Sequence, residues 1–187
     1  METLRDEEMA TAATWFWHHD PRWGYQFLYP EGWHRFTFSD GREGVLYAPS
    51  ATDWTTNFSV EIRDLGVEVT GEDLPDLEAG FREGLRSLPD CQIAWLLHWR
   101  TEPPIILEAK YTFREGTVTR QRRSRLVYVG TRQFHVLVQG ATPADFEEWR
   151  PLLYVMLMSF NASPESPARK EPPRAAHKLD PTSTAKG

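Results

Sequence analysis

The chain has 187 residues, of which 40% are hydrophobic and 26% charged; this composition suits one globular domain and excludes a collagen, a coiled coil or a mainly disordered protein. Its 21 Lys and Arg residues against 27 Asp and Glu residues give a net charge of −6. A body of that sign repels nucleic acid and anionic lipid over most of its surface, so we expect neither as a partner.

The N-terminus lacks both the basic start and the apolar stretch of a signal peptide. No apolar run approaches the roughly 18 residues that a membrane span needs. We therefore expect a cytoplasmic protein without membrane insertion. The single cysteine, Cys91, cannot form an internal disulfide and supplies no cysteine-based metal site.

The aromatic residues divide the chain into three segments. Residues 1–14 are polar and acidic, and we expect a flexible start. Residues 15–160 contain every aromatic residue and form one predicted domain. Residues 161–187 contain five Pro, one Leu and no aromatic residue. They cannot bury enough apolar surface to offset their ordering entropy, so we expect a disordered tail.

Alternating apolar and polar residues predict four short strands in the first half of the domain. These strands are 25–29, 33–38, 43–47 and 57–63. Pro30 and Gly32 favour a tight turn after the first strand, and Asp40-Gly41 favours another after the second.

The period then changes to that of a helix. Thr70 with Asp73 three residues later is typical of a capping box. Apolar residues follow at helical spacing until Pro89, namely Leu74, Leu77, Phe81, Leu85 and Leu88. Gly80 and Gly84 each cost about 1 kcal/mol relative to alanine in a helix interior. We infer that a close approach to the sheet offsets this cost; the alternative is a marginal helix in solvent.

The sequence of the second half of the domain predicts a meander of strands and a final helix. Residues 91–100, 105–113, 118–129 and 133–139 are extended, and two-residue turns at Glu115-Gly116 and Gly130-Thr131 join the last three segments. Thr142-Pro143 then starts a helix whose apolar face runs to Phe160. The order predicts the α+β class, with a central antiparallel sheet flanked by helices as in an α/β/α sandwich.

The two turns determine which residues face each other across the strands. The predicted pairs are Phe113 with Val118, Tyr111 with Arg120, Ala109 with Arg122, Leu107 with Ser124, Leu126 with His135, and Val127 with Phe134. One face of the meander therefore carries Tyr111, Arg120, Arg122 and His135. On the other face Glu108 lies opposite Arg123, in an ion pair worth well under 1 kcal/mol if it is exposed.

Four arginines within six residues form the strongest basic run of the chain: Arg120, Arg122, Arg123 and Arg125. In a functional interpretation, Arg120 and Arg122 beside Tyr111 form a patch for an anion or an acidic peptide, because a guanidinium binds a carboxylate through two hydrogen bonds and stacks on a ring. In a structural interpretation, the arginine stems cover apolar neighbours and the guanidinium groups pair with Glu. Both interpretations stay open at this point.

An aromatic cluster lies near the N-terminus, at Trp15-Phe16-Trp17 and Trp23. It predicts a flap that covers one end of the sheet or contacts a partner. Trp15 and Trp17 are therefore candidate binding residues.

The sequence offers little chemistry for a metal or for catalysis. His18 and His19 point apart in an extended chain, so a metal site would need Asp20 and a distant donor such as His34 or His98. Cys91 has no histidine near it in sequence and is expected to be a buried, inert thiol. His135 is expected to be a packed core histidine. With no phosphate loop, nucleophile elbow or zinc-type histidine pair, we predict no catalytic residue, no metal, no cofactor and no enzyme.

Several of these elements together resemble the PsbP superfamily over residues 24–160. They are Tyr25-x-Phe27-x-Tyr29-Pro30-x-Gly32-Trp33, Thr56-Asn57-x-x-Val60, a helix, a meander with Tyr111 and Tyr128, and a last helix with Trp149 that closes in Ser159-Phe160. The resemblance implies a central antiparallel sheet between helices and a mostly non-enzymatic role. Its branches support photosystem II, bind the Ran GTPase, sit on the bacterial envelope as lipoproteins, or hold hydrophobic effector segments as Eag chaperones. The chain lacks the export signal and lipid-anchoring cysteine of some branches, and no metal-binding or Ran-contact residue is carried over.

These observations predict a binding or assembly module that recruits a protein partner, with a homodimer left open. The candidate binding residues are Tyr111, Arg120, Arg122, His135, Trp15 and Trp17. The alternatives are a carrier of a small or lipid-like ligand in a pocket between sheet and helix, and a hydrolase of unrecognised type.

Overall fold

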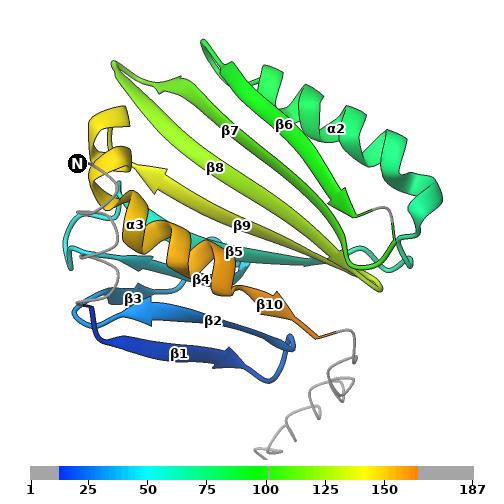
Figure 1. Cartoon of the computed structure of the whole chain (residues 1–187), viewed down its shortest axis with the longest axis horizontal. Helices are drawn as coiled ribbons and strands as arrows, with labels where there is room; N and C mark the ends of the chain where they lie inside the picture. The colour runs from blue at the N-terminus through cyan, green and yellow to red at the C-terminus, as the bar shows by residue number, and fades with distance from the viewer. Residues whose placement is uncertain (1–12, 101, 164–187) are drawn as a thin grey trace, which may run out of the picture.

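The computed structural model describes residues 13–100 and 102–163, which form ten strands and two α-helices (Figure 1). In chain order these are β1 (Trp15–Asp20), β2 (Tyr25–Pro30), β3 (His34–Phe36), β4 (Glu43–Ala48), β5 (Asn57–Asp64), a 3-10 turn (Gly71–Asp73), α2 (Leu74–Arg86), β6 (Gln92–Arg100), β7 (Ile105–Glu115), β8 (Val118–Val129), β9 (Arg132–Gly140), α3 (Pro143–Ser159) and β10 (Asn161–Ala162). The predicted flexible start, apart from residues 13–14, and the tail beyond residue 163 lie outside the described residues. Neither described α-helix is long and apolar enough to cross a membrane.

The strands form two antiparallel sheets. The larger has the order β3-β4-β5-β9-β8-β7-β6, and the smaller has the order β1-β2-β10. The α+β class, with helices on both faces of a central antiparallel sheet, is confirmed. The prediction of a single sheet is wrong. Tyr25 and Phe27 of β2 pack their rings on Phe134 and Phe58, at centroid distances of 5.8 and 4.6 Å, so β2 covers a face of the larger sheet instead of extending its edge.

The main core lies on the face of the larger sheet that is covered by α3 and the small sheet. The predicted alternation of Phe58, Val60 and Ile62 holds, and all three are buried there. They meet apolar residues of β9 and α3, namely Phe134, Val136, Val138, Phe146, Leu153, Met156 and Leu157. The small sheet closes this core with β10, whose two residues belong to the segment expected to be a tail and pair with Gln26 and Tyr25 of β2.

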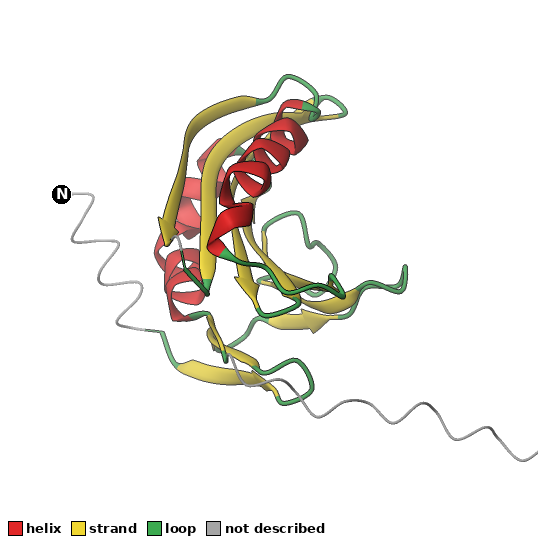
Figure 2. Ribbon diagram, turned by 90° about the vertical axis from the view of Figure 1, so that its right-hand side faces the viewer, coloured by secondary structure: helices red, strands yellow, loops and turns green. Residues whose placement is uncertain are grey.

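The opposite face of the larger sheet is only half covered. Helix α2 packs there on β7 and β8: Leu85 belongs to one cluster with Tyr111, and Phe81 packs on the cluster that contains Leu126. The sheet curves around this helix (Figure 2). On the same face, β9, β5 and β4 have no described helix above them. The uncovered half of this face is where the candidate site lies.

The predicted capping box forms on the 3-10 turn that leads into α2, but the glycines of α2 do not behave as predicted. The Thr70 backbone N–H donates to the Asp73 carboxylate at 2.8 Å, which completes the capping box. The inferred close approach to the sheet at Gly80 and Gly84 is wrong, because a Cβ built at either position meets no atom within 4 Å. Both glycines instead line a cavity between α2 and the sheet.

Replacing Gly84 by Ala should therefore stabilise the protein. Because the added methyl group meets open space, the main effect is the lower backbone entropy of the unfolded chain, and we expect a gain of about 0.5 to 1 kcal/mol in the free energy of unfolding. Urea denaturation followed by tryptophan fluorescence measures the change. A loss of stability would mean that the glycine does carry a close contact.

The first hairpin turn lies one residue later than predicted. Glu115 pairs with Val118, so the loop is Gly116-Thr117. Gly116 has φ +62° and Gly130, the first residue of the second loop, has φ +59°. A left-handed first loop residue suits glycine and strains glutamate, which is why the loop cannot begin at Glu115. The second turn and the pairs Leu126 with His135 and Val127 with Phe134 are confirmed.

The late turn shifts the β7–β8 register by two residues. Tyr111 pairs with Arg122 instead of Arg120, Phe113 with Arg120 instead of Val118, Ala109 with Ser124 instead of Arg122, and Leu107 with Leu126 instead of Ser124. An even shift leaves every side chain on its predicted face. Glu108 now lies directly opposite Arg125 and still forms an ion pair with its diagonal neighbour Arg123. This cluster is not exposed, because Glu108 is fully buried.

Candidate functional site

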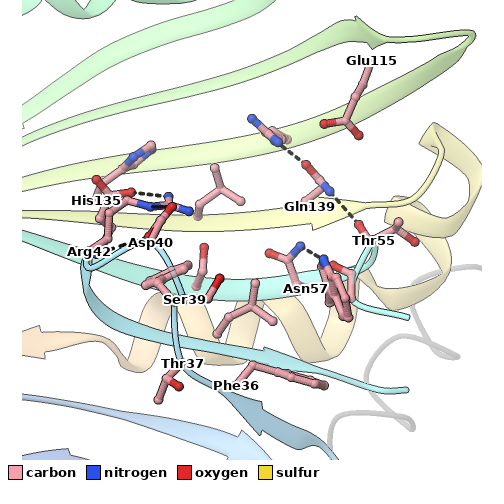
Figure 3. A pocket seen from close by; sticks show the side chains of 17 residues that line it. Phe36, Thr37, Ser39, Asp40, Arg42, Thr55, Asn57, Glu115, His135 and Gln139 are labelled. Carbon is pink, nitrogen blue, oxygen red and sulfur yellow. Dashed lines mark hydrogen bonds and ion pairs between the residues drawn. The ribbon is translucent and has the colours of Figure 1, made fainter. Parts of the chain in front are cut away.

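A groove made of two adjoining cavities, of about 590 and 430 Å³, begins on the uncovered half of the larger sheet and extends under α2. The first is bordered by the loop 37–42 and by Trp54, as Figure 3 shows in part, and the second lies under α2. Glu61, Arg122 and His135 line both cavities, so the two adjoin across β5, β9 and β8, between the loop 37–42 and α2.

The strand register builds the floor of the groove in cross-strand rows. Tyr111, Arg122, Gln139 and Asn57 are direct neighbours on β7, β8, β9 and β5, and we call them the Arg122 row. The Nε of Arg122 donates to the Oε1 of Gln139. Gln139 in turn donates to the Thr55 carbonyl at 2.7 Å, and Asn57 donates to the Trp54 carbonyl at 2.7 Å (Figure 3). These bonds hold the polar row against the loop that precedes β5.

Arg122 differs from its three neighbours in the basic run. Arg120 pairs with Glu115 and donates to the Ala141 carbonyl, and both Arg123 and Arg125 bind Glu108 on the other face. The structural interpretation, in which the guanidinium groups pair with Glu, therefore holds for Arg120, Arg123 and Arg125. Arg122 lies over the Phe113 ring at 4.3 Å, and within the described residues no carboxylate is at ion-pair distance from it.

A carboxylate and two further arginines lie beside Arg122 in the groove. Glu61 pairs with Arg42 and Arg63, each at 2.8 Å. Burial acts to raise the pKa of Glu61, but the hydrogen bonds from these arginines outweigh it and hold the pKa below the ordinary value. Glu61 is therefore ionised and already neutralised, so it opposes an anionic ligand only weakly.

His135 and Ser124 form a polar contact that a hydrolase hypothesis would need. The Nε2 of His135 lies 3.2 Å from the Ser124 hydroxyl, which also contacts the Tyr111 hydroxyl at 3.0 Å. Ser124 is fully buried, and Glu61, the carboxylate opposite His135, binds arginines instead. The contact lacks an accessible nucleophile and an orienting acid, so it does not have the geometry of a catalytic triad.

The stability of the protein should fall as His135 becomes protonated in the unfolded chain. Desolvation, together with Arg122 and Arg63, outweighs the opposing effect of Glu61 and lowers the pKa of His135 to about 4. The unfolded state then binds the proton first as the pH drops from 6.5 to 4, and the His135 contribution to stability is lost across this window. We expect the wild type to lose about 2 to 3 kcal/mol more than His135→Gln between pH 7 and 4 in urea denaturation. Parallel pH profiles of the two proteins would contradict the assignment.

Both ends of the groove are apolar. Phe36, Phe38, Leu46 and Trp54 line the outer cavity, and Leu77, Phe81, Leu85 and Leu88 line the inner cavity below α2, while Leu126 and Leu137 lie between them beside His135. Trp54 is 57% exposed and lies 5.9 Å from the Phe36 ring. The groove can therefore contact apolar groups on either side of a polar centre.

The predicted site residues fall into two separate regions. Tyr111, Arg122 and His135 come together in the groove, while Arg120 lies at its edge beside the first hairpin turn. Trp15 and Trp17 do not join them, because the predicted flap is strand β1 of the small sheet. Trp17 is 59% exposed there and Trp15 packs on the main core.

His18 and Cys91 are held by packing. His18 is buried between Phe27, at 4.7 Å, and Tyr47, whose hydroxyl lies 3.1 Å from its Nδ1. Burial lowers the pKa of His18 to about 4. Cys91 is half-buried, and desolvation raises the pKa of its thiol. Within residues 13–100 and 102–163 no group of three or more His, Cys, Asp or Glu side chains is arranged to hold a metal ion.

The candidate residues Tyr111, Arg122 and His135 line the groove, but its other lining residues were not predicted. Gln139 and Trp54 carry no motif, and Asn57 appears only in the Thr56-Asn57-x-x-Val60 element of the PsbP resemblance; their alternate positions along predicted strands could have placed Asn57 and Gln139 on the Arg122 face. Within the loop 37–42 the turn at Asp40-Gly41 was predicted, but the position of Arg42 over the Phe38 ring, at 4.4 Å, was not.

Comparison with known proteins establishes the fold. No protein-family model and no curated protein matches the sequence. Among solved structures, cyanobacterial PsbP from Synechocystis has a TM-score of 0.57 at 15% identity, covering 81% of this chain and 94% of its own. LpqN, involved in cell envelope biogenesis of Mycobacterium tuberculosis, has a TM-score of 0.55 at 11% identity, covering 86% of this chain and 96% of its own. The likeness is one of fold, and it agrees with the resemblance noted in the sequence.

Proposed function

We propose that this chain, whose fold is that of PsbP, is a non-enzymatic binding module that recruits a segment of a partner protein into the groove. The observation that carries the proposal is that Glu61, Arg122 and His135 line both cavities, so that the two adjoin. An open, elongated surface with a polar centre and apolar ends fits an extended chain.

The floor of the groove favours a peptide over a lipid tail. Asn57, Ser59 and Gln139 line the outer cavity, and polar groups covered by an acyl chain would lose their hydrogen bonds to water without replacement. A peptide brings its own N–H and C=O groups to such a floor. A segment of a protein can therefore cover the groove at lower cost.

A carrier of a small or lipid-like ligand is the second candidate, and the inner end of the groove favours it. Leu77, Phe81, Leu85 and Leu126 line a cavity of about 430 Å³ there. This candidate predicts that a soluble fatty acid such as laurate raises the melting temperature of the wild type but not that of Gly84→Trp. An unchanged melting temperature would count against it.

The proposed function is tested by quantitative affinity capture from native lysate with three baits. Gly84→Trp places a large side chain in the groove, whereas Trp17→Ala alters an equally accessible surface on β1. We expect a partner retained by the wild type and by Trp17→Ala to be reduced at least tenfold with Gly84→Trp. Melting curves establish that both variants are folded. Equal capture by Gly84→Trp and wild type would refute the groove as the binding surface, and selective loss with Trp17→Ala would assign binding to β1.

We also propose that the protein and its partner meet in the cytoplasm. Fractionation of cells that express the full chain tests this location.

A further inference from the structure

We infer that the groove recognises an extended peptide in which one acidic side chain lies between two apolar side chains. The inference rests on the proposed function and names the chemistry of its ligand. Three features of the groove carry it, namely a cation without an anionic partner, a buried acceptor without a donor, and an apolar surface on each side of both.

The first feature is the charge of Arg122. Its guanidinium is held in place by the Phe113 ring and by the bond from Nε to Gln139. Its two Nη groups donate no hydrogen bond to any described residue, and every described carboxylate lies beyond ion-pair distance. A guanidinium fixed at Nε and open at Nη presents the geometry that binds a carboxylate of an Asp or Glu side chain.

The second feature is the side chain of Asn57, which belongs to the Arg122 row. Asn57 is only 6% exposed and lines the outer cavity. Its Nδ2 donates to the Trp54 carbonyl, and its Oδ1 accepts no hydrogen bond within the described residues. A buried acceptor left in this state is costly. A peptide N–H supplies the missing donor once the Asn57 side chain turns toward the occupant.

The third feature is the pair of apolar ends, which sets the spacing of the peptide. Neighbouring strands lie about 4.8 Å apart, so Leu46 on β4, three strands from Arg122 on β8, is roughly 14 Å away. An extended peptide covers that distance in about four residues. On the other side, Phe81 and Leu85 of α2 pack over β7 and β8, so the second apolar side chain lies within about two residues of the acid.

The charges around the groove are compatible with this ligand. Four acids line the groove, namely Glu61, Asp40, Glu115 and Asp76. Glu61 and Asp40 both pair with Arg42, and Glu61 also pairs with Arg63, while Asp76 lies in the first turn of α2 and lines only the inner cavity. Glu115 is bound to Arg120. The charge left without a partner at the centre is the positive charge of Arg122, which favours an acid and disfavours Lys or Arg at the same peptide position.

The test uses the full chain and a phage-displayed library of random dodecapeptides. A peptide selected by the wild type is synthesised with a fluorescent label, together with a version in which its acid is replaced by the amide. Fluorescence polarisation then gives the affinity of each peptide for the wild type, Arg122→Gln and Arg86→Gln. Arg86 makes the matched control because it lies at the exposed end of α2 and does not line the groove.

We expect selected peptides to carry an acid flanked by apolar residues at the spacing given above. Arg122→Gln and the amide peptide should each weaken binding at least tenfold, the two changes together should cost little more than either alone, and Arg86→Gln should stay within twofold. Peptides without an acid that bind wild type and Arg122→Gln equally, but fail to bind Gly84→Trp, would overturn the acid preference and leave the groove function standing. Peptides that bind Gly84→Trp as well as wild type, or a library that yields no binder, would overturn both.

Discussion

Replacing Glu108 by Gln is expected to lower the free energy of unfolding by about 3 to 5 kcal/mol. Glu108 is fully buried and accepts hydrogen bonds from the Nε atoms of Arg123 and Arg125. Both guanidinium groups are themselves largely buried, with Arg123 between Trp95 and Tyr154. The amide removes the only negative charge of this cluster and leaves two buried cations facing each other. Urea denaturation at pH 7 measures the loss.

The matched control is Glu78→Gln on α2. Glu78 forms a partly exposed ion pair with Arg82 one helical turn away, and such pairs are worth about 0.3 to 0.5 kcal/mol. Both substitutions replace a carboxylate by an amide. The difference between the two losses in the free energy of unfolding therefore reports the effect of burial. Equal and small effects would show that Arg123 and Arg125 are neutralised by solvent and not by Glu108.

Replacing Gly140 by Ala should destabilise the protein by about 3 kcal/mol or more, and should leave part of it unfolded at 37 °C. Gly140 is the last residue of β9, and a Cβ built there lies 2.3 Å from the Phe146 backbone nitrogen and 2.5 Å from its Cα. The helix backbone cannot yield without moving Phe146 and its neighbours out of the main core. The addition of one methyl group therefore separates α3 from the sheet.

Gly84→Ala is the control for this substitution, because it adds the same methyl group with the opposite expected sign. Thermal melts of the two variants beside the wild type should place Gly140→Ala several degrees below it and Gly84→Ala slightly above it. A Gly140→Ala protein that melts with the wild type would mean that α3 docks on the sheet with more clearance than the structure shows.

Local patterns predicted most elements of the fold. Alternation identified β5, the capping box placed the 3-10 turn that leads into α2, and glycine in the first loop position predicted the second hairpin. The first hairpin was misplaced because the same glycine requirement was not applied to Gly116. The small sheet was missed because its pairing joins β2 to β10 from the opposite end of the domain, and no local pattern encodes such a contact.

The site was predictable only where three consecutive strands, joined by two hairpin turns, build it. Tyr111, Arg122 and His135 share a face because β7, β8 and β9 are consecutive. The alternation of side chains between the two faces of the sheet is enough to place them together. Asn57 joins the Arg122 row through the pairing of β5 with β9, which are far apart in sequence. The open space at Gly80 and Gly84 depends on how far α2 stands from the sheet, and helical spacing does not contain that distance.

The buried cluster around Glu108 also determines how the chain leaves α3. Two arginines against one glutamate leave one surplus positive charge, and the Nη1 of Arg125 donates at 3.0 Å to the Leu157 carbonyl in the last turn of the helix. That turn carries no basic residue of its own, so a strand supplies the cation that complements the negative pole of the helix macrodipole. The end of α3 is thereby anchored to β8, and the following residues are directed into β10 at the edge of the small sheet.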